Sequence, residues 1–299
     1  MEPGLLMAIG GAEDKARERV ILRAFVEAAG GPDANVVVLA TASELAETGD
    51  RYAGIFESLH ADTVEVLRVR SREDALDAGS GVLDLLEFAS GLFITGGSQL
   101  RISTALGGTA IAATIRRRHA EGMVVAGTSA GAAILSEHMI SMGDSGATPR
   151  RRLVQMAKGL GLAPEIVIDQ HFRQRDRLGR LVTALSYNPG PLGIGVDEDT
   201  AAVIHGGEMR VIGSGAVTVL DASGARYTDI PEVRRGQAVS MLGLKLDFLT
   251  SGCRYDLRRR VALPPLAGKP SLEEEAADLS YSLSLGTGER VGERGNGIK

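Results

Sequence analysis

The 299-residue sequence has a single cysteine, Cys253, no tryptophan, and only 4% aromatic residues. One cysteine excludes an intramolecular disulfide framework and any metal site built from several thiolates. No apolar run approaches the ~20 residues that a membrane-spanning helix requires. The first residues, Met1-Glu2-Pro3-Gly4, also lack the basic region that opens a secretion signal. These absences predict a cytoplasmic protein with no membrane partner.

A large excess of charge of either sign is also absent. The formal net charge is −5 and charged residues make up 24% of the chain, so the overall balance gives no reason to expect nucleic acid as a partner. The glycine pairs Gly10-Gly11 and Gly96-Gly97 match neither the dinucleotide-binding fingerprint nor the phosphate-binding P-loop. We therefore expect no cofactor and no metal.

What the sequence does contain is a regular alternation of apolar runs and amphipathic stretches. This alternation predicts an α/β protein with a mostly parallel sheet and helices on both of its faces. Strands are expected at Leu5–Ile9, Asn35–Leu39, Thr63–Val69, Leu92–Thr95, Met123–Ala126 and Glu165–Ile168. Helices are expected at Glu13–Ala29, Tyr52–Leu59, Ala75–Phe88, Thr109–Ala120 and Ala130–Met139.

The pattern changes from Gly193 onwards. Short apolar runs separated by glycine-containing turns predict C-terminal β-hairpins that extend or edge the main sheet. These runs are Gly193–Val196, Thr200–His205, Glu208–Gly213 and Ala216–Asp221. After Pro264 the chain is rich in glycine, serine and charge, and it has little to bury. We expect a single domain over residues 1–263 and a partly disordered tail over residues 264–299.

The segment Met123–Ile134 carries the clearest chemical signal. An apolar run leads into Gly127-Thr128-Ser129-Ala130-Gly131, and small residues typical of a helix start follow. This is the pattern of a nucleophile elbow, a sharp strand-to-helix turn that exposes a serine hydroxyl. The flanking glycines allow other backbone to approach the serine closely. Ser129 is therefore the candidate nucleophile, and the alternative is a tight turn with an ordinary serine.

A serine nucleophile needs a base, and the chain has five histidines. His60 and His119 end predicted helices, which favours surface positions, and His138 lies within the predicted helix after the elbow. His171 follows the predicted strand Glu165–Ile168, at the edge where open parallel sheets bind their ligands. This position favours His171 as the base.

The base in turn needs a carboxylate to orient it. Asp197-Glu198-Asp199 follows an apolar segment and offers three candidates, although acidic triplets are usually solvated turns. In α/β-hydrolases the chain order is serine, acid, histidine, which here would require His205, in a predicted hairpin strand. The order serine, histidine, acid fits this sequence better and indicates a different fold family.

Backbone N–H groups near the elbow are candidates for an oxyanion hole. The N–H of Ala130 opens the helix after Ser129, where the helix dipole favours negative charge. Gly96-Gly97 follows a predicted strand, and the Gly97 N–H is the second candidate donor. A plain tight turn at these glycines is the alternative.

A cluster of arginines follows His171. Arg173, Arg177 and Arg180 recur at i, i+4 and i+7, which predicts one helix face, whereas Arg175 lies off this stripe. Charges at helical spacing usually form a solvated face. So close to a candidate catalytic histidine, however, arginines can clamp carboxylates through paired hydrogen bonds.

Together these segments resemble the cyanophycinases, in the serine-peptidase family that also contains aspartyl dipeptidase (peptidase E). The resemblance covers most of residues 5–260 and is carried by Ile9–Lys15, Phe93–Arg101, Gly127–Ala132, Asp169–Arg180 and Gly195–Ala201. The Asp169–Arg180 block is the most specific, because it separates cyanophycinase-like chains from the shorter dipeptidases. Ser98 departs from the family, which more often has an acidic or amide residue before the glutamine.

The resemblance implies a flavodoxin-like fold of the class I glutamine-amidotransferase type, without a cofactor and assembled as a homodimer. It implies a catalytic triad of Ser129, His171 and Glu198. It also implies that the substrate is bound by Gln99, Asp169, Gln170, Arg175, Arg177 and Arg180.

The implied substrate is cyanophycin, a poly-aspartate whose side-chain carboxyls are each amide-linked to arginine. A serine-type exopeptidase would release β-aspartyl-arginine dipeptides from it through an acyl-enzyme. One alternative is an aspartyl dipeptidase acting on short Asp-containing peptides, against which the arginine block and the chain length argue. A second alternative is a non-catalytic amidotransferase-like binding protein, which the intact serine, histidine and glutamate set disfavours.

Overall fold

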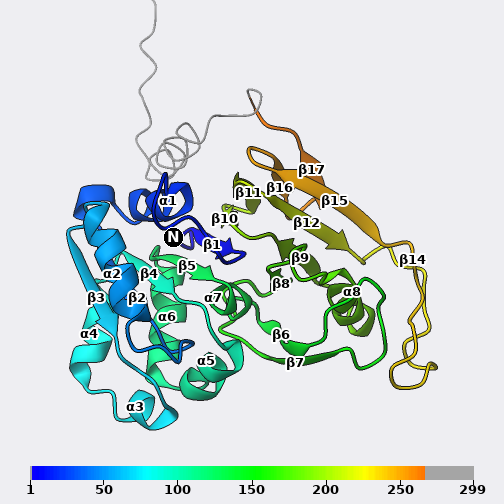
Figure 1. Cartoon of the computed structure of the whole chain (residues 1–299), viewed down its shortest axis with the longest axis horizontal. Helices are drawn as coiled ribbons and strands as arrows, with labels where there is room; N and C mark the ends of the chain where they lie inside the picture. The colour runs from blue at the N-terminus through cyan, green and yellow to red at the C-terminus, as the bar shows by residue number, and fades with distance from the viewer. Residues whose placement is uncertain (1, 267–299) are drawn as a thin grey trace, which may run out of the picture.

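A computed structural model of the chain describes residues 2–266 (Figure 1). The predicted tail therefore lies outside the described residues from position 267 onwards. Within the described part, the largest element is a nine-stranded mixed sheet. In order across the sheet, its strands are β17 (Val261–Leu263), β16 (Arg254–Asp256), β11 (Glu208–Gly213), β10 (Thr200–His205), β1 (Leu6–Ile9), β5 (Val124–Thr128), β4 (Gly91–Ile94), β2 (Asn35–Leu39) and β3 (Thr63–Leu67).

The direction of pairing changes at β1. From β1 through β5, β4 and β2 to β3 every neighbouring pair is parallel, whereas β10, β11, β16 and β17 pair antiparallel. Val36, Val37 and Val38 of β2 are all buried, as expected for a parallel strand covered on both faces. The predicted hairpin of β10 and β11 is confirmed, and it extends the sheet beside β1.

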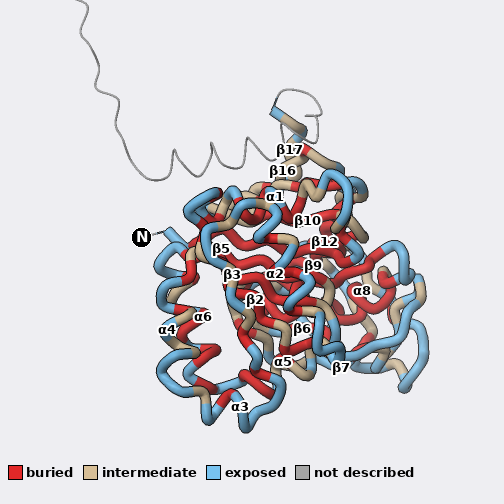
Figure 2. Tube along the Cα trace, turned by 60° about the vertical axis from the view of Figure 1, so that its left-hand side comes forward, coloured by how far each residue is buried: buried red, intermediate tan, exposed pale blue. Residues whose placement is uncertain are grey.

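Helices cover both faces of the large sheet, as predicted. Their bounds are α1 (Val20–Ala28), the 3₁₀ helix η1 (Gly31–Asp33), α2 (Thr48–Ser58), α3 (Arg72–Leu76), α4 (Ser80–Phe88), α5 (Gln99–Leu106), α6 (Ala110–Ala120), α7 (Ala130–Ala133) and α8 (Leu178–Tyr187). Phe25 of α1 and Phe56 of α2 pack against Val38 on one face. Leu86 of α4 packs in the core on the other face, which also contains Val37. Figure 2 shows the buried strands enclosed by helices whose outer sides are exposed.

A second, four-stranded sheet stands beside the first. Its strands, in order, are β15 (Lys245–Thr250), β12 (Ala216–Asp221), β9 (Leu192–Val196) and β8 (Ile166–Gln170). β8 and β9 are parallel, and α8 covers them through Leu181 and Leu185. Two further strand pairs complete the described fold: β6 (His138–Gly143) with β7 (Val154–Lys158), and β13 (Tyr227–Thr228) with β14 (Met241–Leu242).

The helix predicted over Glu13–Ala29 begins only at Val20. The preceding residues form a loop around the Asp14 carboxylate, which accepts hydrogen bonds from the backbone N–H groups of Arg19, Ala16 and Arg17. These bonds lower the pKa of Asp14 to about 2. An aspartate that satisfies nearby N–H groups in this way competes with a helix.

The helix predicted over Ala130–Met139 is wrong beyond Ala133, where α7 ends. His138, expected inside that helix, instead begins β6. After α7 the backbone pairs with a distant segment, since the N–H of Leu160 donates to the carbonyl oxygen of Ile134 at 2.7 Å. This long-range pairing overrides the local preference of small residues for helix. The prediction also lacked α5, β6, β7 and the strands from β13 to β17, and the helix predicted over Ala75–Phe88 is divided into α3 and α4.

Candidate active site

The carboxyl end of β1 holds three loops together. The backbone N–H groups of Ser129, His171 and Asp199 donate at 2.9, 2.8 and 2.9 Å, respectively, to the carbonyl oxygens of Ile9, Gly10 and Gly11. These loops follow β5, β8 and β9, so both sheets contribute to them. The carboxyl ends of parallel strands are where open α/β sheets bind ligands.

Ser129 has the backbone of a nucleophile elbow. Its φ of 54° and ψ of −113° fall in a region that non-glycine residues seldom adopt. It stands between the last residue of β5 and the first residue of α7. Gly131 is required on the far side of the turn, because a Cβ there would lie 2.1 Å from the carbonyl oxygen of Ile94. The predicted strand–turn–helix geometry is therefore present.

His171 lies between the Ser129 hydroxyl and a carboxylate. Its Nε2 is 2.9 Å from Ser129 Oγ, and its Nδ1 is 2.6 Å from Glu198 Oε1. Gly11 packs against the imidazole, since a Cβ at that position would come within 2.4 Å of the His171 Cε1. The distances from His171 to Ser129 and to Glu198 are short enough for proton transfer and for orientation of the base, respectively.

The structure gives the three neighbouring acids different partners. Asp197 is fully buried and accepts a hydrogen bond from Arg173 Nε at 2.5 Å. Asp199 accepts one from the Ser214 hydroxyl at 2.8 Å. Glu198 is the one that contacts the imidazole, with its side chain 34% exposed. Of the three carboxylates that the sequence left open, Glu198 is placed to orient the base.

Burial lowers the pKa of His171 below its ordinary value of 6.5. The hydrogen bond to Glu198 opposes this shift, whereas the positive charge of Arg175 adds to it. The neutral imidazole is the form that accepts a proton from serine. The environment therefore keeps His171 in its basic form at neutral pH.

We expect the acid limb of the kcat/KM profile to have its midpoint below pH 6.5, the ordinary pKa of histidine. Protonation of His171 on acidification removes the base, and the lowered pKa moves that loss to more acidic pH. Initial rates at substrate concentrations well below KM, measured from about pH 4.5 to pH 8, give this midpoint. A midpoint above about pH 7 would contradict the assigned environment of His171.

Both candidate oxyanion donors stand beside the elbow. Ala130 opens α7, where a helix leaves its first N–H groups without intrahelical partners. Gly96 precedes the other donor, Gly97, and a Cβ on Gly96 would lie 3.2 Å from the Ser129 Cβ. Within residues 2–266, neither the Ala130 nor the Gly97 N–H donates a hydrogen bond to a protein acceptor. Both groups are thus free to bind an oxyanion.

Four of the residues implied for substrate binding form one buried ionic cluster. Arg180 donates to both carboxylate oxygens of Asp169, through Nε at 2.6 Å and through Nη2. Arg177 Nη1 contacts the same carboxylate at 3.3 Å and the Gln170 side-chain oxygen at 2.7 Å. Burial lowers the pKa of Arg177 to about 10, opposed by Asp169, so the guanidinium stays charged at neutral pH. Both guanidinium groups face Asp169 instead of open space.

The remaining two implied residues lie apart from this cluster. Arg175 is exposed, and among the described residues its side chain makes no hydrogen bond or ion pair. Gln99, at the start of α5, donates through Nε2 to the carbonyl oxygens of Ile140 and Ser141, at 3.0 and 3.1 Å. The Gln99 amide therefore joins the start of α5 to β6 through two hydrogen bonds.

The predicted helix face of Arg173, Arg177 and Arg180 is wrong. Helix α8 begins at Leu178, and the preceding residues form turns. Arg173 contacts Asp197, whereas the other two arginines contact Asp169. The spacing of the arginines in the sequence did not reveal that two of them would pair with Asp169 on β8.

A buried group on the other side of Ser129 was missed by the sequence reasoning. The Glu13 carboxylate accepts hydrogen bonds from the Tyr52 hydroxyl and from Thr128 Oγ1, the latter at 2.6 Å. Lys15 Nζ lies 2.9 Å from the same carboxylate. The segment Ile9–Lys15 contributed to the family resemblance, but nothing local indicated that Glu13 would contact Thr128, the residue before Ser129.

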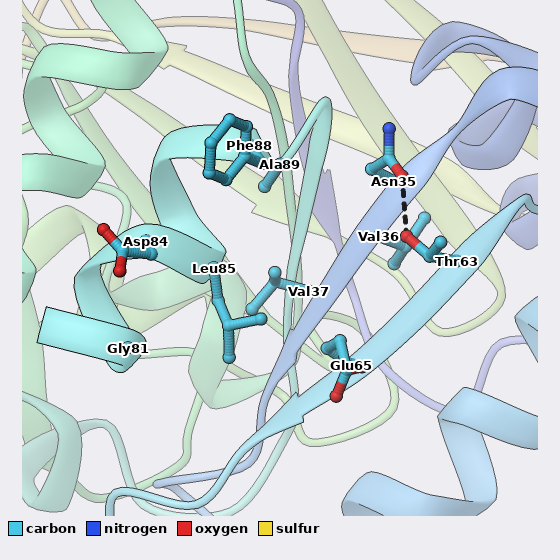
Figure 3. A pocket seen from close by; sticks show the side chains of 10 residues that line it. All are labelled: Asn35, Val36, Val37, Thr63, Glu65, Gly81, Asp84, Leu85, Phe88 and Ala89. Carbon is cyan, nitrogen blue, oxygen red and sulfur yellow. Dashed lines mark hydrogen bonds between the residues drawn. The ribbon is translucent and has the colours of Figure 1, made fainter.

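A cavity of about 330 Å³ opens directly onto Ser129 and His171. Larger and smaller cavities lie elsewhere. One of about 630 Å³ is lined by His119 and His205 among others, and one of about 150 Å³ lies between α4 and the amino ends of β2 and β3. Figure 3 shows the latter, where Asn35 accepts a hydrogen bond from Thr63 at 2.6 Å. Ser129, His171 and Glu198 line neither of these two cavities.

No group of three or more histidine, cysteine, aspartate or glutamate side chains in the described part of the chain is arranged to hold a metal ion. No helix among residues 2–266 is both long and apolar enough to cross a membrane.

Comparison with known proteins identifies the family. The sequence model of Peptidase family S51 matches residues 5–212. The chain belongs to this family. The resemblance noted in the sequence is thereby confirmed, and the protein is a hydrolase of the peptidase class.

Curated relatives extend this match over most of the chain. The cyanophycinase of Trichormus variabilis is 45% identical over 262 residues, which are 87% of this chain and 87% of the relative. The cyanophycinase of Geminocystis herdmanii is 42% identical over 266 residues, covering 88% of this chain and 96% of the relative.

Solved structures support the fold. The crystal structure of a peptidase from an acI-B1 Actinobacterium has a TM-score of 0.64 at 20% identity and covers 85% of this peptidase and 97% of its own chain. A putative peptidase E from Listeria monocytogenes has a TM-score of 0.50 at 17% identity, covering 71% and 100%. These likenesses fit the flavodoxin-like, class I glutamine-amidotransferase-like α/β fold predicted from the sequence.

Proposed function

We propose that this peptidase degrades cyanophycin as a serine-type exopeptidase, releasing β-aspartyl-arginine dipeptides. The observation that supports this most strongly is the line from Ser129 Oγ through the imidazole of His171 to Glu198, with contacts of 2.9 and 2.6 Å. The substrate class is supported by relatives named cyanophycinase at 42–45% identity. No metal or cofactor is needed for this chemistry.

The proposed reaction follows from this geometry. His171 Nε2 takes the proton of the Ser129 hydroxyl as Oγ attacks the scissile carbonyl carbon. The N–H groups of Gly97 and Ala130 bind the oxyanion of the tetrahedral intermediate. The protonated imidazole, stabilised by Glu198, then gives its proton to the leaving amine, which leaves an acyl-enzyme. Water attacks this ester with His171 again as base, and Ser129 regains its proton.

Arg175 is the residue of the block best placed to meet an incoming carboxylate. It is exposed, and it is close enough to His171 to lower the pKa of that imidazole. Arg177 and Arg180 are proposed to act indirectly, by holding the Asp169 carboxylate beside the site. The carboxylates of cyanophycin can pair with the arginines of this cluster, and its guanidinium groups can pair with the Asp169 carboxylate.

The exposed Arg175 and the buried Arg180 are expected to respond differently to substitution. Arg175→Ala should lower kcat/KM on cyanophycin by roughly 10- to 150-fold, because a charge-assisted hydrogen bond is lost, and leave the unfolding temperature unchanged. Arg180→Ala should instead destabilise the protein by about 3–5 kcal/mol, since it leaves the Asp169 carboxylate buried without its main partner. Steady-state kinetics and thermal unfolding on the same samples measure both effects.

Arg116→Ala is the matched control, because Arg116 is exposed on α6. It should change neither quantity. If Arg175→Ala also reduces labelling of the folded enzyme by a small fluorophosphonate, Arg175 supports catalytic geometry and does not bind substrate.

The proposed substrate is tested by incubating the purified protein with a suspension of cyanophycin granules. Clearing of the suspension with release of β-aspartyl-arginine is the expected result. Release of aspartate from a short α-aspartyl peptide, without clearing, would favour an aspartyl dipeptidase. Failure of the folded protein to react with a serine-directed fluorophosphonate would favour a binding protein without catalysis.

We further propose that the protein acts in the cytoplasm. We also propose that it works as a homodimer, which light scattering of the purified protein measures directly. A monomeric mass in the active preparation would remove the dimer from the proposal.

A further inference from the structure

The cavity beside the triad has a wall that the arginine block does not reach. Its lining includes Lys15, Arg51 and Tyr52 together with Ser129 and His171, and among its lining residues none comes from the Asp169–Arg180 block except His171. The loop after β1 and helix α2 supply this wall. A substrate bound across the elbow would therefore meet a second surface, in which Lys15 and Arg51 stand together with Glu13 and Glu47.

Lys15 is held in a fixed position on this wall. Its Nζ lies 2.9 Å from Glu13 Oε1 and donates to the Glu13 carbonyl oxygen at 3.3 Å. The same atom lies 5.3 Å from the centre of the Tyr52 ring, a favourable position for a cation. An ammonium group has three N–H donors, so these two contacts leave one donor for a ligand. The Lys15 side chain is 22% exposed, which gives that donor access to the cavity.

Glu13 is held in place and does not occupy the third N–H donor of the Lys15 ammonium group. Its side chain is 1% exposed, and both of its carboxylate oxygens already accept hydrogen bonds, from Tyr52 and Thr128. Burial would raise the pKa of Glu13, but the Lys15 charge and these bonds together lower it, so the carboxylate stays ionised. Thr128 directly precedes Ser129 in the chain, so the Glu13 carboxylate connects the Lys15 ammonium group to the elbow.

We propose that Lys15 is a specificity-determining residue that binds a carboxylate of the substrate in this cavity. The proposal rests on the function proposed above, and it adds to Arg175 a second carboxylate-binding residue that lies outside the arginine block. Arg51 and Glu47 also line this cavity and are both exposed, so their opposite charges offset each other and the preference for an anionic ligand comes from the Lys15 ammonium group. Cyanophycin offers two sources of such a carboxylate, the arginine branches and the end of the aspartate backbone.

Kinetics on three synthetic oligomers of β-aspartyl-arginine test the proposal. The first oligomer carries all its carboxylates, the second has an amide at the end of the backbone, and the third has argininamide branches. For Lys15→Met, kcat/KM on the first oligomer should fall roughly 10- to 150-fold, mainly through KM. On the oligomer that lacks the bound carboxylate, the variant and the wild type should be equal, which identifies the source.

Three controls separate the outcomes. Lys158→Met, an exposed lysine on β7, should leave every rate unchanged. Lys15→Met should keep the wild-type rate of labelling by a small uncharged fluorophosphonate, and Lys15→Arg should recover part of the affinity. An equal loss on all three oligomers would mean that Lys15 only supports the Glu13 contact, and the proposal would be overturned.

The wild type distinguishes this proposal from the one on which it rests. Wild-type protein that reacts with the fluorophosphonate but cleaves none of the three oligomers would overturn the proposed function and this inference together. Wild-type protein that cleaves them, with Lys15→Met indistinguishable from it, would overturn the inference alone.

Discussion

Ser129→Ala is expected to abolish hydrolysis and leave the fold intact. In the proposed mechanism the hydroxyl supplies the attacking oxygen, and loss of a member of a catalytic triad reduces the rate by on the order of 10⁴- to 10⁶-fold. The substitution removes a single hydrogen bond, to His171 Nε2, which is worth only ~1 kcal/mol of stability. Cyanophycin cleavage and thermal unfolding of the same preparation measure the two effects.

Ser90→Ala is a suitable control for this experiment. Ser90 precedes β4 at the opposite end of the sheet, where its hydroxyl accepts a hydrogen bond from the Asn35 N–H at 2.9 Å. The variant loses this bond and the longer one that the Ser90 hydroxyl donates to the Asn35 carbonyl oxygen at 3.4 Å. Neither bond touches the site, so the rate of this variant should match the wild type. Activity of Ser129→Ala within tenfold of the wild type would remove this serine from the mechanism.

His171→Ala is expected to reduce kcat more than Glu198→Gln does. The imidazole carries the proton in both half-reactions, whereas the carboxylate orients it and stabilises its charged form. Loss of the orienting acid is usually the less costly of the two, by about one to two orders of magnitude. Single-turnover rates on cyanophycin, compared at a pH where the wild type is fully active, measure this order.

Asp197→Asn provides the comparison that tests the acid assignment. Asp197 is buried and paired with Arg173, so this variant should lose stability and keep its chemistry once folded. The kinetics are therefore measured on protein shown to be folded by circular dichroism. If folded Asp197→Asn were slower than Glu198→Gln, Glu198 would not be the orienting acid.

The fold was predictable where the sequence signal is local. The valine run of β2 reports burial on both faces of a strand, and the glycines around Ser129 report a tight turn. Prediction failed where distant backbone decides, as after Ala133, where pairing with the segment around Leu160 replaces a helix. Small residues such as those after the elbow are compatible with either outcome, so no local pattern distinguishes them.

The site divides in the same way. Ser129, His171 and the acidic triplet Asp197–Asp199 could be predicted because each follows a strand, and strand ends meet at one edge of a sheet. The choice of Glu198 within the triplet came only from the family resemblance. The partners of the arginines could not be predicted from the sequence. Arg177 and Arg180 both pair with the buried Asp169 carboxylate on β8, across a turn whose sequence resembles a helix.

The same limit applies to Glu13 and Lys15. Their side chains meet Tyr52 and Thr128, which are 39 and 115 residues from Glu13 in the chain. A short segment containing an acid and a base two residues apart is ordinary on any surface. Its burial beside the nucleophile depends on how β1, β5 and α2 pack, which is a property of the whole fold.

The most direct test of the central assignment is to map the site of fluorophosphonate attachment while following cyanophycin cleavage. Mass spectrometry of the digested, labelled protein should place the adduct on Ser129, and clearing of the cyanophycin suspension should fall in proportion to the fraction labelled. An adduct on another residue, or full clearing by completely labelled protein, would contradict the assignment of Ser129 as the nucleophile of a cyanophycin-degrading peptidase.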